Sequence, residues 1–289
     1  MRGRSIVIAI SVVALLALLG VVIGRQLSGS GIKIPGIKSE ECTATADGVA
    51  TLGLDQMANA ATIAAVGIRR NVPPRAITVA LATALQESKL HNLSGGDRDS
   101  VGLFQQRPSQ GWGTATQISD PRYAARRFYS ALLKVNGWQS MSITDAAQSV
   151  QRSALPDAYQ QWAGQSAVIA RALLGDVSHA VACEVGDSPQ TRGTKAVTAL
   201  QSLLRGDWGS VLRVASISDP NAVALVASDD RAGWQYAHWL VAHAQDTGVM
   251  RVRFGTQQWT AKSGTWGRAG DPESSAPGET VIAEVYGIT

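Results

Sequence analysis

Residues 5–24 read SIVIAISVVALLALLGVVIG, a run of twenty residues without a charged side chain. As a helix, such a run matches the thickness of the hydrocarbon core of a bilayer. Arg2 and Arg4 precede it and Arg25 follows directly, without a small-residue cleavage pattern, which favours an uncleaved anchor over the alternative of a cleaved signal peptide. The pattern predicts a single-pass plasma-membrane protein whose cytoplasmic stub and anchor occupy residues 1–24 and whose folded part lies outside the cell.

The composition divides the rest of the chain into four segments. Residues 25–41 are rich in Gly, Ser and Pro, which predicts a tether. Residues 42–183 have the pattern of a mainly α domain, and residues 184–193 have that of a linker. In residues 194–289 helical and β-rich runs alternate, which predicts a small α/β or α+β domain.

Several elements can be predicted from caps and periodicity. Helices are expected after Asp55, at 74–88, at 121–133 behind Asp120, and at 156–174. The helix at 74–88 is apolar on nearly every side, so it should be central and buried. In the last segment we expect helices at 194–204 and 234–245 and strands at 210–216, 222–228, 249–254 and 280–286.

Cys42 and Cys183, the only cysteines, flank the expected α domain. In an exported protein such a pair is expected to form a disulfide, the alternative being two buried thiols. Closing a loop of this length would stabilise the domain by roughly 4 to 5 kcal/mol.

The charge balance and the histidine spacing argue against a nucleic-acid-binding protein and against a metalloprotein. After residue 41 the chain holds 21 Lys and Arg against 20 Asp and Glu, which gives a nucleic-acid partner no support. The four histidines are scattered, and His238 and His243 do not have the i,i+4 spacing of metal pairs. We therefore predict no metal and no cofactor.

The chemically informative residues concentrate in LQESKLHNLSGGDRDSVGLFQQRPS, residues 85–109. Glu87 comes near the end of the buried helix, where partial burial would keep its carboxyl protonated near neutral pH. A protonated carboxyl in an apolar wall is what acid-catalysed glycosidic cleavage needs. The plainer alternative is a solvated glutamate at a helix end.

A Glu-Ser pair and a Gly-Leu-Phe-Gln segment stand fifteen residues apart, and an Ala-Tyr pair follows later. The residues concerned are Glu87, Ser88, Gly102, Leu103, Phe104, Gln105, Ala158 and Tyr159. Together they resemble the signature of the lytic transglycosylases and goose-type lysozymes in the lysozyme-like superfamily. The resemblance implies that residues 42–183 form a lysozyme-like catalytic domain.

The resemblance also implies a groove for peptidoglycan strands of alternating N-acetylglucosamine and N-acetylmuramic acid. Glu87 would protonate the scissile oxygen and then accept the proton of the sugar's 6-hydroxyl, which leaves a 1,6-anhydro end. The 102–105 backbone and the Gln105 side chain would line the groove, Ser88 would orient Glu87, and Tyr159 would face the acid. Ordinary core packing for Tyr159 and a helix-end cap for Ser88 are the alternatives.

Because of two acids in the loop between the motifs, the sequence does not decide between an anhydro product and a hydrolytic one. Hydrolysis with inversion needs a second carboxylate to activate water, and Asp97 or Asp99 would be candidates for that base. A solvated turn is the commoner role of a Gly-Asp-Arg-Asp loop. Gln106, Arg107 and Pro108 also depart from the best-known branches, so a hydrolytic lysozyme is the alternative to a lytic transglycosylase.

Two further classes of function fit parts of the sequence. One is a catalytically quiet peptidoglycan-binding scaffold of a cell-surface machine, whose segment 194–289 docks a protein partner. The other is a plain membrane-tethered interaction protein. The expected partners are thus peptidoglycan glycan strands, the membrane through residues 5–24, and a protein at 194–289.

Overall fold

The computed structural model describes residues 40–151, 156–186, 189, 191–270 and 279–287. The expected anchor at 5–24 and the tether as far as residue 39 lie outside these ranges. Within them, no helix is both long enough and apolar enough to cross a bilayer. This finding contradicts the predicted single-pass topology and the plasma-membrane location.

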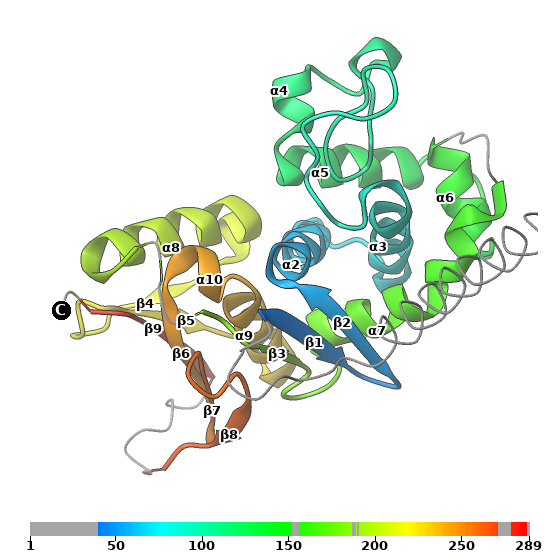
Figure 1. Cartoon of the computed structure of the whole chain (residues 1–289). Coiled ribbons are helices and arrows are strands. Elements are labelled where there is room, and N and C mark those ends of the chain that lie inside the picture. Colours follow the sequence, from blue (N-terminus) through cyan, green and yellow to red (C-terminus); the bar gives the residue numbers. More distant parts are fainter. Residues whose placement is uncertain (1–39, 152–155, 187–188, 190, 271–278, 288–289) are drawn as a thin grey trace, which may run out of the picture. The chain divides into compact units, whose positions relative to one another are not determined.

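The described residues form helices, short 3-10 turns and two antiparallel sheets (Figure 1). The helices are α2 (Leu54–Arg69), α3 (Pro74–Ser88), α4 (Ala115–Ile118), α5 (Pro121–Leu132), α6 (Ile143–Gln151), α7 (Ala163–Leu173), α8 (Gly193–Trp208), α9 (Asp230–Ala242) and α10 (Ala244–Thr247). The 3-10 turns are η1 (Pro108–Gln110), η2 (Pro156–Trp162) and η3 (Gly209–Val211). The strands are β1 (Glu41–Thr45), β2 (Val49–Gly53), β3 (Val181–Cys183), β4 (Val214–Ala215), β5 (Ala222–Val226), β6 (Val249–Phe254), β7 (Gln257–Thr260), β8 (Trp266–Arg268) and β9 (Thr280–Val285).

The first sheet has the order β2-β1-β3 and corrects the expected fold class. A mainly α domain was predicted for residues 42–183, but the fold is mixed α/β. The physical reason is the segment 41–53, where buried residues alternate with more exposed ones on both sides of an Asp47-Gly48 turn. Alternation with period two around such a turn specifies a β-hairpin rather than a tether or a helix.

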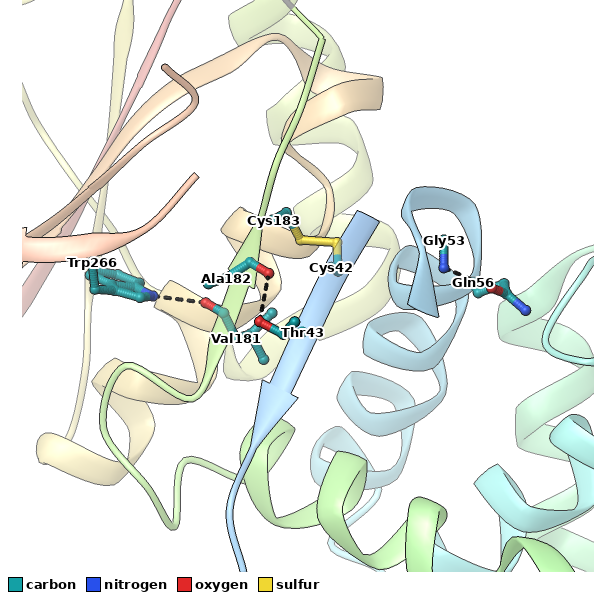
Figure 2. The surroundings of a disulfide bond; sticks show 8 residues. All are labelled: Cys42, Thr43, Gly53, Gln56, Val181, Ala182, Cys183 and Trp266. Atoms are coloured by element: carbon teal, nitrogen blue, oxygen red, sulfur yellow. Dashed lines mark hydrogen bonds between the residues drawn. A yellow bond between two sulfur atoms is a disulfide. The ribbon is translucent and has the colours of Figure 1, made fainter. Parts of the chain in front are cut away.

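A disulfide joins Cys42 of β1 to Cys183 of β3, directly opposite in the antiparallel register (Figure 2). The predicted disulfide is therefore confirmed. Trp266 of β8 donates from Nε1 to the carbonyl oxygen of Val181 at 2.7 Å, so the second sheet also holds β3. Strand β3 is thus fixed from both sides, although it has only three residues.

Helix α3 lies at the centre of the helical part, as its apolar sequence predicts. It packs against α2, α5, α6, α7 and η2. Ten of its fifteen residues are buried. Pro74 stands at its first turn, where a missing backbone N–H costs nothing. The helix ends with Glu87 and Ser88, the first pair of the sequence motif.

The second sheet has the order β4-β5-β9-β6-β7-β8, and α9 packs on β6 and β9. Helices α8 and α9 also pack against α2 of the helical part (Figure 1). One continuous apolar cluster contains buried residues of both parts, and residues 40–289 form a single compact unit. The domain boundaries expected at 183 and 194 stay a prediction.

Candidate active site

Glu87 and Ser88 are the last two residues of α3, and the chain turns sharply after them. Lys89 and Leu90 adopt positive φ angles of 55° and 63°, which side chains disfavour. Two amides of α2 hold this turn. Gln56 Nε2 donates to the Lys89 carbonyl at 2.6 Å, and Asn59 Nδ2 donates to the Leu90 carbonyl at 2.8 Å. These bonds stabilise an otherwise unfavourable backbone directly beside the glutamate.

The Glu87 carboxyl is half-buried and faces a tyrosine. The hydroxyl of Tyr159, in η2, donates to Glu87 Oε1 at 2.6 Å, and the Tyr159 side chain is 0% exposed. Trp162, at the end of η2, donates from Nε1 to Gln86 Oε1 at 2.8 Å. The turn η2 is therefore bound along the end of α3, and this places the phenol against the acid.

Ser88 links the two halves of the motif. Its hydroxyl lies 2.8 Å from the Leu103 carbonyl oxygen and 3.1 Å from that of Ala84, and it is buried. Gly102 has a φ of 76°, and a Cβ there would lie 2.7 Å from the carbonyl oxygen of Ile118. Only glycine fits at this position, so the segment 102–105 can approach both the end of α3 and the end of α4.

The segment 102–105 exposes its side chains unequally. Leu103 and Phe104 are fully buried, and Phe104 stacks on Phe128 of α5 with ring centroids 4.8 Å apart. Gln105 is part-buried, and its Nε2 donates to the Gly102 carbonyl at 3.0 Å. Any ligand beside this segment therefore meets its backbone and the Gln105 amide rather than the two apolar side chains.

The two loop acids have different surroundings. Asp99 Oδ1 accepts from Arg107 Nε at 2.8 Å, and Asp99 Oδ2 accepts from the Ser109 backbone N–H at 2.8 Å. The hydrogen bond from Arg107 has the largest effect on the Asp99 carboxyl, and those from Ser109 add to it. Together they hold the pKa of Asp99 well below its usual range. The Asp97 side chain is 91% exposed, and its ion-pair partner Arg98 lies 3.9 Å away. Asp99 thus fastens the loop to the residues after the motif.

Comparison with models of known protein families finds no match, and comparison with curated proteins finds no similar sequence. The resemblance to lytic transglycosylases and goose-type lysozymes therefore stays a prediction. Any functional role of the motif residues therefore has to be argued from the hydrogen bonds and burial described above.

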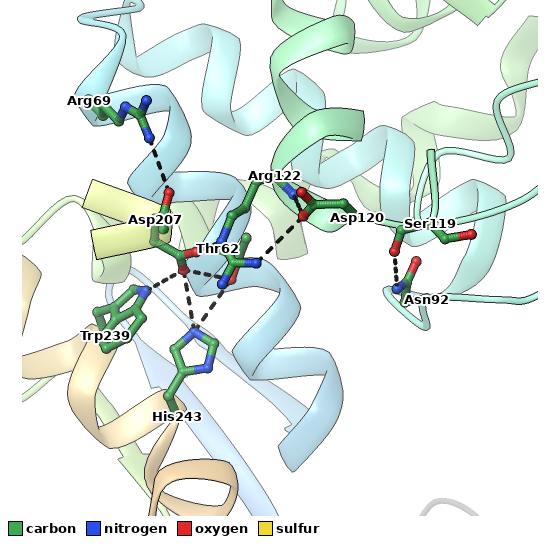
Figure 3. Close-up of polar contacts among 10 residues, drawn as sticks. Thr62, Arg69, Asn92, Ser119, Asp120, Arg122, Asp207, Trp239 and His243 are labelled. Carbon is green, nitrogen blue, oxygen red and sulfur yellow. Dashed lines mark hydrogen bonds and ion pairs between the residues drawn. The ribbon is translucent and has the colours of Figure 1, made fainter. Parts of the chain in front are cut away.

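A buried polar junction was not anticipated from the sequence (Figure 3). Asp207 of α8 is fully buried, and its Oδ2 accepts from Thr62 Oγ1 and from Trp239 Nε1, each at 2.8 Å. Its Oδ1 accepts from Arg122 Nε of α5 at 2.6 Å. The signal for this junction was present in α8, where an acid falls on the apolar stripe formed by Leu200 and Leu204.

Over the ranges that the structure describes, no three His, Cys, Asp or Glu side chains come together as a ligand group. The buried ring of His238 is instead bonded on both nitrogens, with Nε2 2.9 Å from the Ala180 backbone nitrogen and Nδ1 2.8 Å from the Ala172 carbonyl oxygen. Because the first is a donor and the second an acceptor, the ring is neutral with its proton on Nδ1.

Proposed function

We propose that this chain cleaves the β-1,4 bond between N-acetylmuramic acid and N-acetylglucosamine in peptidoglycan, with Glu87 as both acid and base. The observation that carries the proposal is the 2.6 Å hydrogen bond from Tyr159 to the half-buried Glu87 carboxyl. A phenol that donates to Oε1 orients the carboxyl and leaves Oε2 to carry the proton toward the sugar.

The proposed reaction needs one carboxyl in two successive roles. Glu87 gives its proton to O4 of N-acetylglucosamine as the bond from O4 to C1 of N-acetylmuramic acid breaks. The 6-hydroxyl oxygen of the muramic acid ring then bonds to C1, and its proton passes back to the Glu87 carboxylate. No water is consumed, and the product ends in a 1,6-anhydro sugar. The acetamido group of the substrate supports the positive charge that develops at C1.

The surroundings of the other acids support this route over hydrolysis. Hydrolysis with inversion requires a second carboxylate that is available to activate water across the sugar ring. Both oxygens of Asp99 already accept hydrogen bonds from Arg107 and Ser109. Asp97 is directed to solvent, with a 91% exposed side chain. Neither acid has the surroundings of a poised base.

The test is digestion of purified peptidoglycan with the full-length chain, native and Glu87→Gln, with the products identified by mass spectrometry. We expect anhydro-muropeptides from the native chain and a rate lower by about 10² to 10⁴ in the variant, the usual contribution of a general acid. Asp97→Asn is the matched control, since it makes the same chemical change on the exposed loop and should keep the native rate.

Two outcomes would overturn the proposal. One is an equal rate of product formation by the native chain and a folded Glu87→Gln variant. The other is the absence of product from both folded proteins, which would leave a protein that binds glycan without cutting it.

A further inference from the structure

A cavity of about 710 Å³ lies between α5, α6 and the loop at 110–112. This volume is within the range of roughly 300 to 1,000 Å³ that is typical of small-ligand sites. Trp112 contributes a partly buried indole to the wall, and Ser149 and Gln151 of α6 contribute polar groups. The cavity therefore offers an apolar surface, hydrogen-bonding groups and enough room for a short peptide.

The charge of this cavity is positive and unbalanced. Arg127 of α5 and Lys134, just beyond the end of α5, line it, and no acid is among its lining residues. Neither cation forms an ion pair with any residue that the structure describes, and both are exposed. Arg127 Nη2 donates to the Gly111 carbonyl at 2.8 Å, which holds the guanidinium at the rim. Two uncompensated cations in a concave surface attract an anion.

The cavity shares a wall with the candidate active site. Gln151 lines it and also donates from Nε2 to the Phe104 carbonyl at 2.7 Å. Phe128, the neighbour of Arg127 in α5, stacks on Phe104. A ligand in the cavity would thus be adjacent to the segment that is bonded to Ser88 at the end of α3.

We propose that the cavity binds the carboxylates of the peptide stems that N-acetylmuramic acid carries. This inference rests on the proposed function, because it names a second part of the same substrate. Glycan strands whose lactyl groups are joined to peptides are neutral along the sugar chain, so the anionic charge of the substrate lies in the stems. A stem held by Arg127 and Lys134 would place its sugar next to the motif segment.

The first experiment compares two soluble peptidoglycan substrates that share one glycan: native stems, and stems whose carboxylates are converted to amides. We expect the Arg127→Gln/Lys134→Gln variant to raise KM for the native substrate about five- to tenfold with kcat unchanged, as the loss of two partly exposed ion pairs implies. On the amidated substrate the variant and the native chain should be equal. The matched control is Lys195→Gln/Arg205→Gln, which removes two exposed cations from α8.

The second experiment separates this inference from the proposed function. Calorimetric titration of the full-length Glu87→Gln variant with the free peptide L-Ala-γ-D-Glu-meso-diaminopimelyl-D-Ala should show binding, which the added Arg127→Gln/Lys134→Gln changes weaken about five- to tenfold. This result stands even if no glycan is cleaved. Absence of peptide binding, or equal effects of the double variant on both substrates, would overturn the inference while leaving the cleavage proposal intact. Binding of a poly(glycerol phosphate) chain without binding of the peptide would also overturn it.

Discussion

Two carboxyl groups at the ends of two helices, Glu87 of α3 and Asp207 of α8, have opposite surroundings. Glu87 is half-exposed, and its carboxyl accepts a hydrogen bond from the Tyr159 hydroxyl. Asp207 is 0% exposed and accepts from Thr62, Arg122 and Trp239 (Figure 3). The carboxyl chemistry is the same in both residues, but the available lone pairs and the access of solvent differ.

This difference indicates which acid can react and which acid holds the fold. A buried carboxylate whose oxygens all accept bonds is costly to disturb, because each donor would lose its partner. A carboxyl with an accessible oxygen and one orienting donor can pass a proton to a ligand. We therefore expect substitutions at the two acids to separate stability from activity.

The largest expected effect on stability is at the junction. Asp207→Ala should lower the free energy of unfolding by about 3 kcal/mol, because it leaves the partly buried Arg122 without its closest carboxylate. Asp207→Asn should cost less, since an amide oxygen still accepts from Trp239. Urea denaturation measures both variants, with the exposed Asp97→Ala as the control that changes little. A loss of less than 1 kcal/mol in Asp207→Ala would remove the contrast between the two acids.

Acid should also destabilise the fold, through the buried ring of His238. Burial, the largest cause, lowers the pKa of His238 to about 3. Since the folded-state pKa lies below the unfolded value of about 6.5, the unfolded chain binds more protons below pH 6.5. Stability from this group is thus complete above that pH and declines as the pH falls toward 3, by about 2 kcal/mol at pH 5.

The measurement is the free energy of unfolding at pH 7.5 and pH 5, for the native chain and for His238→Gln. The variant should be less stable at pH 7.5, but it should lose less stability on acidification, because it has no ring to protonate. His179, whose pKa is also lowered by burial, contributes in the same direction and is retained in the variant. An identical pH dependence in both proteins would contradict the assignment of the acid sensitivity to His238.

The smallest expected effect is at the active site. Tyr159→Phe should lower the cleavage rate about tenfold, since it removes one hydrogen bond to a group that carries charge during the reaction. Its free energy of unfolding should change little. Tyr236→Phe removes a hydroxyl that donates to the Val211 carbonyl at 3.4 Å, and it should leave the rate unaltered. Equal rates in all three proteins would show that the phenol does not assist Glu87.

Local signals predicted a large part of the helical framework. Helix α3 begins at Pro74 and ends at Ser88, as expected. Asp120 caps α5 by accepting a hydrogen bond from the Arg122 backbone N–H. Expected strands at 222–228, 249–254 and 280–286 contain β5, β6 and β9. These elements have strong caps or apolar runs that contain Val and Ile, so their neighbours in sequence are enough to specify them.

Elements that depend on distant partners were not predicted. Strand β3 has three residues and exists through its pairing with β1, which is some 140 residues away in sequence. The junction at Asp207 depends on side chains from α2, α5 and α9 that no local pattern brings together. In the site, the resemblance to the family signature pointed to Glu87 and Tyr159, whereas the bonds that occupy Asp99 follow from the fold of its loop.

The most direct test of the central claim is digestion of peptidoglycan by the native chain in water enriched in ¹⁸O. If Glu87 acts alone as acid and base, the new muramic acid ends will be 1,6-anhydro sugars without the label, each lighter by one water than a reducing end. Label at C1 of reducing muramic acid ends would contradict the claim, because water would then be the nucleophile and a second base would have to activate it.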